Sequence, residues 1–210
     1  MRRVVLAVAV LLVAPAQAAL DGPPIPEQRP VPRAPGAPGE LVVVPGESKA
    51  PRGRDYVLRY AVEVEGGLRV DRHAFAAAVE RVLADRRGWV GAGLAFRRVS
   101  AGSVDFRVTL ASPGLTDGLC APLPTNGIFS CASGNRAVLN VLRWTRGADA
   151  YRGRLGRYRV YMVNHEVGHV LGHGHAWCPA TGERAPVMMQ QTKGLGGCRP
   201  NPWPFPYRDA

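Results

Sequence analysis

The 210 residues are 46% hydrophobic and 20% charged, which is enough apolar material for one domain with its own core. This composition excludes a fully disordered chain, and a single long apolar run at the very start excludes a polytopic membrane protein. Only Lys49 and Lys193 of the 27 basic residues are lysines, and the net charge is +11. That charge raises nucleic acid as a partner, but the arginines are scattered and no nucleic-acid motif occurs. We therefore expect a solvated basic surface and no nucleic-acid binding.

The first 18 residues have the anatomy of a secretory signal peptide. Arg2 and Arg3 precede an apolar stretch, and residues 16–18 form a small-x-small cleavage site. The apolar run is shorter than the ~20 residues needed to cross a bilayer, so no stable membrane span is expected after cleavage. An uncleaved N-terminal anchor is the alternative. The segment 1–18 thus predicts a secreted protein, either extracellular or associated with the cell envelope.

Residues 19–54 are rich in proline and poor in aromatic side chains. They contain nine prolines, and such a composition favours extended segments without a core. We interpret this stretch as a linker or tether, with a propeptide as the alternative. The folded domain is then expected over residues 55–210.

The domain pattern alternates strands with two long helices. The segment 56–65 alternates as a half-buried strand does, and Gly66 ends it. Asp71 then caps a helix with an apolar stripe that closes at Gly88. Further elements are expected as strands over 94–99, 104–110 and 136–144, a long loop over 112–134, a helix over 155–172, and turns from there to residue 210.

Four cysteines lie in the second half of the chain. In an exported protein an even number of cysteines favours disulfides, here two bonds out of three pairings. We expect Cys120–Cys131 and Cys178–Cys198 because each pair brackets a loop rich in glycine and proline. Cys178 follows His175 by three residues and is a candidate metal ligand, but the disulfide is the favoured role.

Four of the five histidines fall within one short segment, which begins His165-Glu166-Val-Gly-His169. On a helix His165 and His169 lie about 40° apart and one turn above the other, so both imidazoles share a face. Glu166 lies at the edge of that face, where its carboxylate reaches a metal-bound water without ligating the metal. Two histidines with this spacing predict a metal site, with zinc as the metal.

A catalytic zinc usually has three protein ligands and one open position. Gly172 is expected to end the helix and turn the chain, which brings His175 back as the third ligand. His173 competes for this role, but a helical continuation would rotate it about 40° beyond His169. The predicted zinc ligands are therefore His165, His169 and His175.

The extended motif resembles the signature of the metzincin clan of zinc metallopeptidases, which is followed by a Met-turn. Residues 185–191 are similar to that turn, with Met188 in the better register. The runs 163–169, 178–179 and 197–203 also resemble an uncharacterised family of secreted high-G+C bacterial metzincin-like domains. This resemblance covers residues 55–206. It implies an α+β zincin-like fold: a small mixed twisted sheet, a backing helix, an active-site helix, and an irregular C-terminal subdomain containing the Met-turn.

The resemblance also implies roles for individual residues. Zinc would be bound by the three histidines, Glu166 would be the general base, and Met188 would form a structural floor under the site. The strand over 136–144 would lie at the sheet edge and hold the substrate as an added strand. Tyr158, Tyr161 and Met162 lie near the histidine face, where packing is favoured over a role in lining the cleft.

The sequence therefore predicts a secreted zinc-dependent endopeptidase. One catalytic Zn²⁺ would activate water, and Glu166 would accept its proton. The expected partner is a protein or peptide substrate, and the chain is expected to be a monomer. The alternative is a metal-containing, non-catalytic binding module of the cell envelope. An intact Glu166 argues against that alternative, because a binding module has no use for the carboxylate.

Overall fold

The computed structural model describes residues 36–49, 51 and 56–207, so the expected signal peptide lies outside the described residues. The described strands are β1 (Leu41–Val43), β2 (Leu58–Glu65), β3 (Phe96–Arg98), β4 (Phe106–Ala111), β5 (Cys131–Ser133) and β6 (Arg136–Asn140). The α-helices are α1 (Arg72–Ala84), α2 (Pro113–Cys120), α3 (Val141–Arg146) and α4 (Leu155–Val170). Two 3₁₀ turns cover Trp89–Ala92 and Asp149–Tyr151. The described part of the chain is thus a mixed α+β structure.

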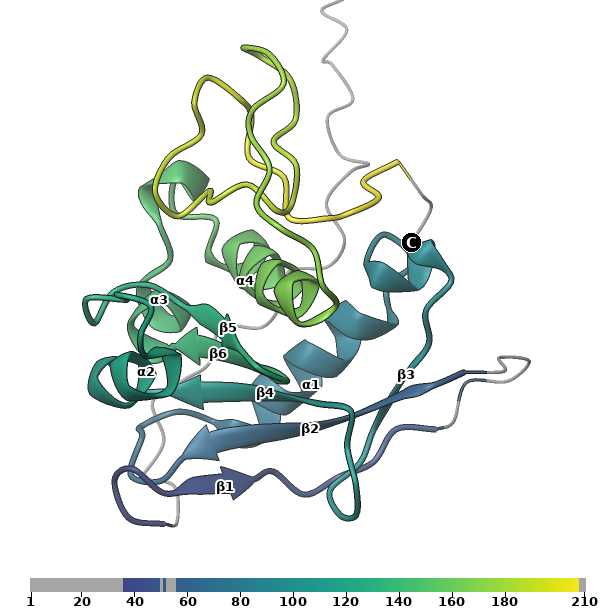
Figure 1. Cartoon of the computed structure of the whole chain (residues 1–210), viewed down its shortest axis with the longest axis vertical. Coiled ribbons are helices and arrows are strands. Elements are labelled where there is room, and N and C mark those ends of the chain that lie inside the picture. The colour runs from purple at the N-terminus through teal and green to yellow at the C-terminus, as the bar shows by residue number, and fades with distance from the viewer. Residues whose placement is uncertain (1–35, 50, 52–55, 208–210) are drawn as a thin grey trace, which may run out of the picture.

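The strands form one mixed sheet in the order β1-β2-β4-β6-β5, with β3 also pairing with β2. Strands β2, β3, β4 and β6 run parallel to one another, whereas β1 and β5 are antiparallel to their neighbours. Figure 1 shows α1 and α4 side by side across one face of this twisted sheet. The irregular segment after α4 lies on the far side of α4 from the sheet.

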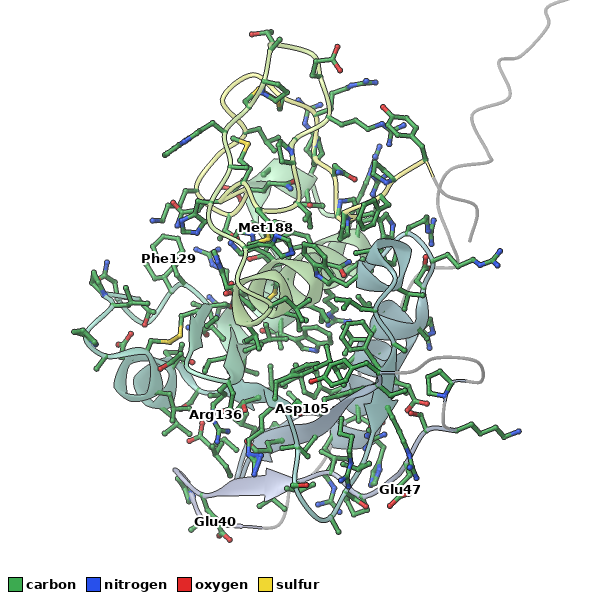
Figure 2. The ribbon with its side chains drawn as sticks, turned by 45° about the vertical axis from the view of Figure 1, so that its right-hand side comes forward. Glu40, Glu47, Asp105, Phe129, Arg136 and Met188 are labelled. Atoms are coloured by element: carbon green, nitrogen blue, oxygen red, sulfur yellow. A yellow bond between two sulfur atoms is a disulfide. The ribbon has the colours of Figure 1, made fainter. Side chains whose placement is uncertain are left out.

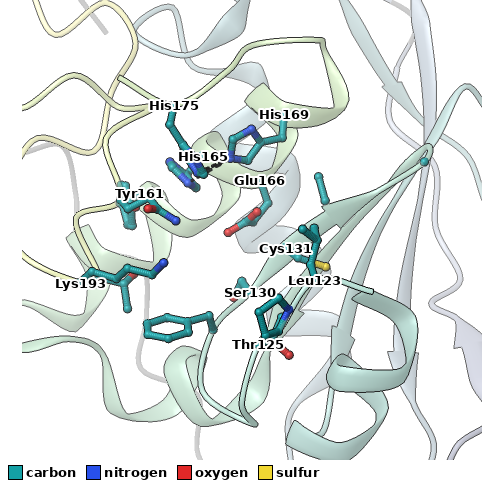
Figure 3. Close-up of a pocket in the computed structure, with 16 residues that line it drawn as sticks. Leu123, Thr125, Ser130, Cys131, Tyr161, His165, Glu166, His169, His175 and Lys193 are labelled. Carbon is teal, nitrogen blue, oxygen red and sulfur yellow. Dashed lines mark hydrogen bonds between the residues drawn. The ribbon is translucent and has the colours of Figure 1, made fainter. Parts of the chain in front are cut away.

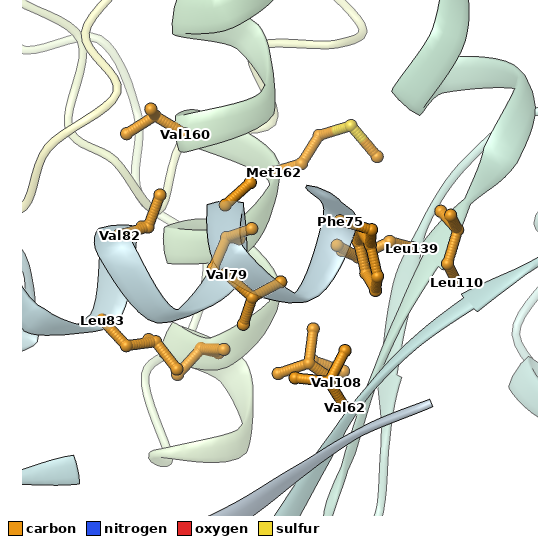
Figure 4. Packing of buried hydrophobic residues seen from close by; sticks show 14 of the residues in the cluster. Val62, Phe75, Val79, Val82, Leu83, Val108, Leu110, Leu139, Val160 and Met162 are labelled. Carbon is orange, nitrogen blue, oxygen red and sulfur yellow. The ribbon is translucent and has the colours of Figure 1, made fainter. Parts of the chain in front are cut away.

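The core fills the space between the sheet and the two long helices (Figure 4). Phe75 and Val79 of α1 and Met162 of α4 are almost completely buried there. Burial of each such side chain contributes roughly 1.5–3 kcal/mol to stability. The expected N-cap of α1 is confirmed, because the Asp71 carboxylate accepts a hydrogen bond from Ala74 N at 2.9 Å. The helix ends at Ala84, before Gly88, because Asp85 is already extended.

Two expected boundaries in the middle of the chain are wrong. The stretch 112–134 was expected to be a loop but contains α2 and β5. Ser112 caps α2 by accepting from Leu115 N at 3.3 Å, and proline is tolerated in the first turn. The strand expected over 136–144 ends at Asn140, whose side chain accepts from Leu142 N at 2.9 Å and starts α3.

The expected tether includes part of the folded domain. Within the segment 19–54, β1 pairs with the second half of β2, and Val44 is completely buried. Val44 N also donates to Val62 O at 2.8 Å. The domain therefore begins before residue 55, because the edge of β2 is paired and covered by this upstream strand. Glycines and prolines around β1 conceal the strand in the sequence.

The segment after α4 forms turns, as expected, with one isolated bridge between Arg184 and Arg199. Both expected disulfides, Cys120–Cys131 and Cys178–Cys198, are present. Cys178 is therefore not available as a metal ligand. Among the described residues, no helix has the length and apolar character needed to cross a bilayer.

Candidate functional site

Helix α4 and the turn after it bring three imidazoles together at the wall of a cleft (Figure 3). The Nε2 atoms of His165 and His169 are 3.3 Å apart, and those of His169 and His175 are 3.1 Å apart. Among the described residues, these three histidines form the one group arranged closely enough to hold a metal ion. The structure thus brings together the three histidines selected from the sequence.

Backbone carbonyls determine which ring nitrogen of two of these histidines carries the proton. Nδ1 of His165 lies 2.8 Å from the carbonyl of Val187, and Nδ1 of His169 lies 2.8 Å from the carbonyl of His173. Because a carbonyl only accepts hydrogen bonds, Nδ1 of each ring carries a proton. Nε2 is therefore the nitrogen of each ring left to bind a cation, and the two Nε2 atoms face one another.

The end of α4 separates His175 from its competitor His173. Gly172 adopts a φ of +91°, and Gly172 N and His173 N donate to the carbonyls of His169 and Gly168, both at 2.9 Å. These two bonds form a Schellman motif, which ends the helix and redirects the chain. The His173 ring then stacks on Trp89, with centroids 4.4 Å apart. His173 contributes its carbonyl to the site, while His175 contributes its ring.

Glu166 lies beside the histidines and lines the same cleft. Its side chain is almost entirely buried, and its Oε2 atom has no hydrogen-bond partner. Burial raises the pKa of Glu166 to about 8, and burial lowers the pKa of the neighbouring His165 to about 3. A buried carboxylate oxygen without a partner is costly, so its position in a cleft indicates a functional role.

The cleft has a volume of about 490 Å³ and lies between α4, strand β5 and the segment that follows α4. Strand β5 is the last strand of the sheet order, so β6 lies inside the sheet and is not the expected edge strand. The loop 121–130 continues the wall formed by β5, and Asp117 holds this loop by accepting hydrogen bonds from Thr125 Oγ1 and Gly127 N. These hydrogen bonds hold the pKa of Asp117 below its usual range.

Met188 lies against α4 at the level of Gly168, on the side of the C-terminal segment (Figure 2). The turn that carries it is pinned by two buried side chains. Tyr161 OH donates to Met189 O and accepts from Gln191 N, both at 2.9 Å. The Gln191 amide bonds to Tyr151 OH, Pro186 O and both backbone groups of Asn201. This network holds the Val187 carbonyl under His165.

The Met188 side chain approaches α4 closely at Gly168. A Cβ atom added there would overlap Met188 Sδ and would lie 2.7 Å from Cζ2 of Trp89. We expect Gly168→Ala to lower the free energy of unfolding by about 1–3 kcal/mol, because the Trp89 ring is held by stacking and has no room to shift. Thermal melts of both proteins check this. Gly174→Ala is the matched control, since nothing lies within 4 Å of its added Cβ, and an equal melting temperature for both variants would contradict the expectation.

Sequence reasoning missed the residues that support the site from other segments. Trp89 donates from Nε1 to the carbonyl of Asn164 at 2.9 Å and also stacks on His173, and no sequence pattern links it to the histidines. Tyr161 was interpreted as a packing residue. It is buried, yet its ring also lines the cleft. Tyr158 and Met162 are buried, as expected.

Comparison with known families gives one match. A family model described as a protein of unknown function, DUF3152, matches residues 31–197. The chain belongs to this family. The DUF3152 match spans the sheet, α4, all three clustered histidines and Met188. No curated protein and no solved structure matches the chain.

Proposed function

We propose that this DUF3152 protein is a secreted, zinc-dependent endopeptidase of metzincin type. The observation that carries the proposal is the convergence of His165, His169 and His175 beside the unpartnered Glu166 carboxylate in an open cleft. The sheet with an antiparallel edge strand, the two helices on one face and the turn at Met188 agree with a zincin-like fold. The two disulfides agree with export, because disulfides persist in oxidising compartments.

The donor set suits zinc. Three neutral imidazoles with one open position are a common catalytic zinc site, and nitrogen ligands around a tetrahedral zinc lie about 3.3 Å apart. The Nε2–Nε2 distances of 3.3 Å between His165 and His169 and 3.1 Å between His169 and His175 agree with that value. The carbonyls of Val187 and His173 would orient the rings from behind, as the outer hydrogen bonds of zinc sites do.

Zinc and Glu166 would have separate roles in peptide hydrolysis. Zinc, when bound, supplies a Lewis acid that makes water more acidic and polarises the substrate carbonyl. Glu166 accepts the proton of the attacking water, and the carboxyl group then passes it to the leaving amine. Burial suits this role, because a carboxylate with a raised pKa holds the proton between the two transfers. The Glu166 side chain lines the cleft, so its carboxylate lies where the reaction would take place.

Strand β5 offers a place for an extended peptide. It is the antiparallel last strand of the sheet, and Cys131 and Ala132 on it line the cleft. An extended substrate can pair with such an edge through backbone hydrogen bonds. Pairing at β5 would pass the peptide across the face of α4 that carries Glu166.

Chelator-sensitive proteolysis tests the proposal. The purified full chain is incubated with a library of internally quenched peptides, before and after treatment with a zinc chelator. We expect cleavage that is lost with the chelator and restored by added Zn²⁺, because His165, His169 and His175 would hold the ion that supplies the Lewis acid. Stoichiometric zinc binding without cleavage of any peptide would favour the non-catalytic envelope module instead.

A further inference from the structure

One charged side chain in the cleft has no role in the proposed chemistry. The cleft lining contains Glu166, the three clustered histidines and Lys193, and no other acidic or basic residue among those described. Figure 3 shows the nitrogen of Lys193 directed into the cleft, across from the wall formed by the loop 121–130 and β5. The chain has only two lysines, so this ammonium group is one of few in a protein dominated by arginine.

Lys193 is held in place by its surroundings. Its backbone N donates to Gln190 O at 2.9 Å, and the preceding Thr192 hydroxyl lies 3.0 Å from Tyr158 OH on α4. The Nζ atom lies 5.1 Å from the centroid of the Phe129 ring, on the opposite rim. The aromatic face attracts the cation and keeps it above the cleft floor.

Within residues 36–49, 51 and 56–207, the ammonium group of Lys193 has no carboxylate partner. The ion pairs among the described residues join other side chains and lie outside the cleft. Lys193 nevertheless lines the same cleft as Glu166 and the three clustered histidines. The cleft thus presents a positive charge that has no ion-pair partner among the described residues.

The neighbouring groups complete a pocket for an anionic side chain. The hydroxyls of Ser130 and Thr192 line the same cleft and can donate to a carboxylate. The Phe129 ring offers an apolar face to the methylene groups of a glutamate side chain. Both features fit a carboxylate carried on a short alkyl chain.

We propose that Lys193 is a specificity-determining residue that selects substrates carrying a carboxylate next to the scissile bond. This inference rests on the proposed peptidase function. The carboxylate comes from an aspartate or glutamate side chain or from a substrate's C-terminus, since all present the same chemistry to the ammonium group. The excess of basic over acidic residues in the chain assists by attracting acidic substrates to the protein.

A charge-swap experiment tests the inference on the zinc-loaded full chain. Quenched peptides differ only by Glu, Gln or Lys at each position flanking the cleavage site, and a second set ends in a free or amidated C-terminus. For the wild type we expect kcat/KM to be roughly threefold to tenfold higher with a carboxylate than with Gln, the effect of one partly screened charge contact. We expect Lys193→Glu to reverse the preference towards Lys peptides while binding the same amount of zinc.

Lys49→Glu is the matched control, because it makes the same change of charge at an exposed lysine outside the cleft. Lys49→Glu should keep the wild-type preference for peptides that carry a carboxylate. A preference for internal glutamate or for a free C-terminus, lost in Lys193→Glu, supports the inference and identifies the source of the carboxylate. Cleavage without charge preference, or a preference unchanged in Lys193→Glu, overturns the inference and leaves the proposed function standing. Failure of the zinc-loaded wild type to cleave any peptide overturns both.

Discussion

Replacing Glu166 by glutamine is expected to lower the rate of peptide hydrolysis by about 10²–10⁴-fold, the usual contribution of a general base. The amide has the size of the carboxyl group, so it fits the same buried site, but it does not accept a proton from water. Initial rates on a quenched peptide measure the loss. Zinc content should stay unchanged, because Glu166 is not among the three clustered histidines that would bind the ion.

Glu183→Gln is the control for this variant. Glu183 is exposed and does not line the cleft, so the substitution should leave the rate as it is. Hydrolysis by Glu166→Gln within twofold of the wild-type rate would overturn the assignment of Glu166 as the base. A parallel loss of zinc would instead assign Glu166 to binding of the ion.

Replacing His175 by alanine is expected to weaken zinc binding strongly, because it removes one of the three proposed ligands. Loss of a residue that only hydrogen-bonds to a ligand usually weakens metal binding about 10–100-fold, and we expect a larger effect here. His173→Ala should retain zinc. The ring of His173 stacks on Trp89, and only its backbone carbonyl, which alanine keeps, accepts the hydrogen bond from His169. The two variants therefore distinguish the roles of two histidines that are only two positions apart in the chain.

Competition titration against a chromophoric chelator measures both affinities. Since His173 also packs against Trp89, a thermal melt of the metal-free His173→Ala protein reports any loss of folding separately. Retained zinc binding in His175→Ala together with loss in His173→Ala would reverse the assignment of the third ligand. Loss of zinc in either variant should abolish chelator-sensitive cleavage.

Sequence patterns that depend only on neighbouring residues predicted much of the fold. The alternation in β2, the Asp71 cap of α1 and the length of α4 all depend on neighbours within a few residues. The errors occur where distant contacts override local signals. α2 contains Gly114 and Gly118, which favour a loop, yet the Ser112 cap and the disulfide from Cys120 to β5 hold it as a helix.

Strand β1 is a second case. Its three residues stand among prolines and glycines, so a tether was the natural interpretation of the surrounding sequence. Pairing of Leu41 with Glu65 and of Val43 with Glu63 makes it part of the sheet. The position of β5 outside β6 is likewise a property of strand order, which is not encoded in the pattern of either strand.

The sequence by itself therefore predicted a mixed α+β structure and a histidine cluster beside Glu166, and the described residues contain both. The cluster was predictable because helix periodicity and a glycine stop act over a few residues. Only the tertiary structure decided which atoms surround that cluster. The Val187 carbonyl behind His165, the Trp89 ring against His173 and the Lys193 side chain in the cleft all come from segments outside α4. Packing brings those segments together, and it makes one of the scattered positive charges a candidate determinant of substrate choice.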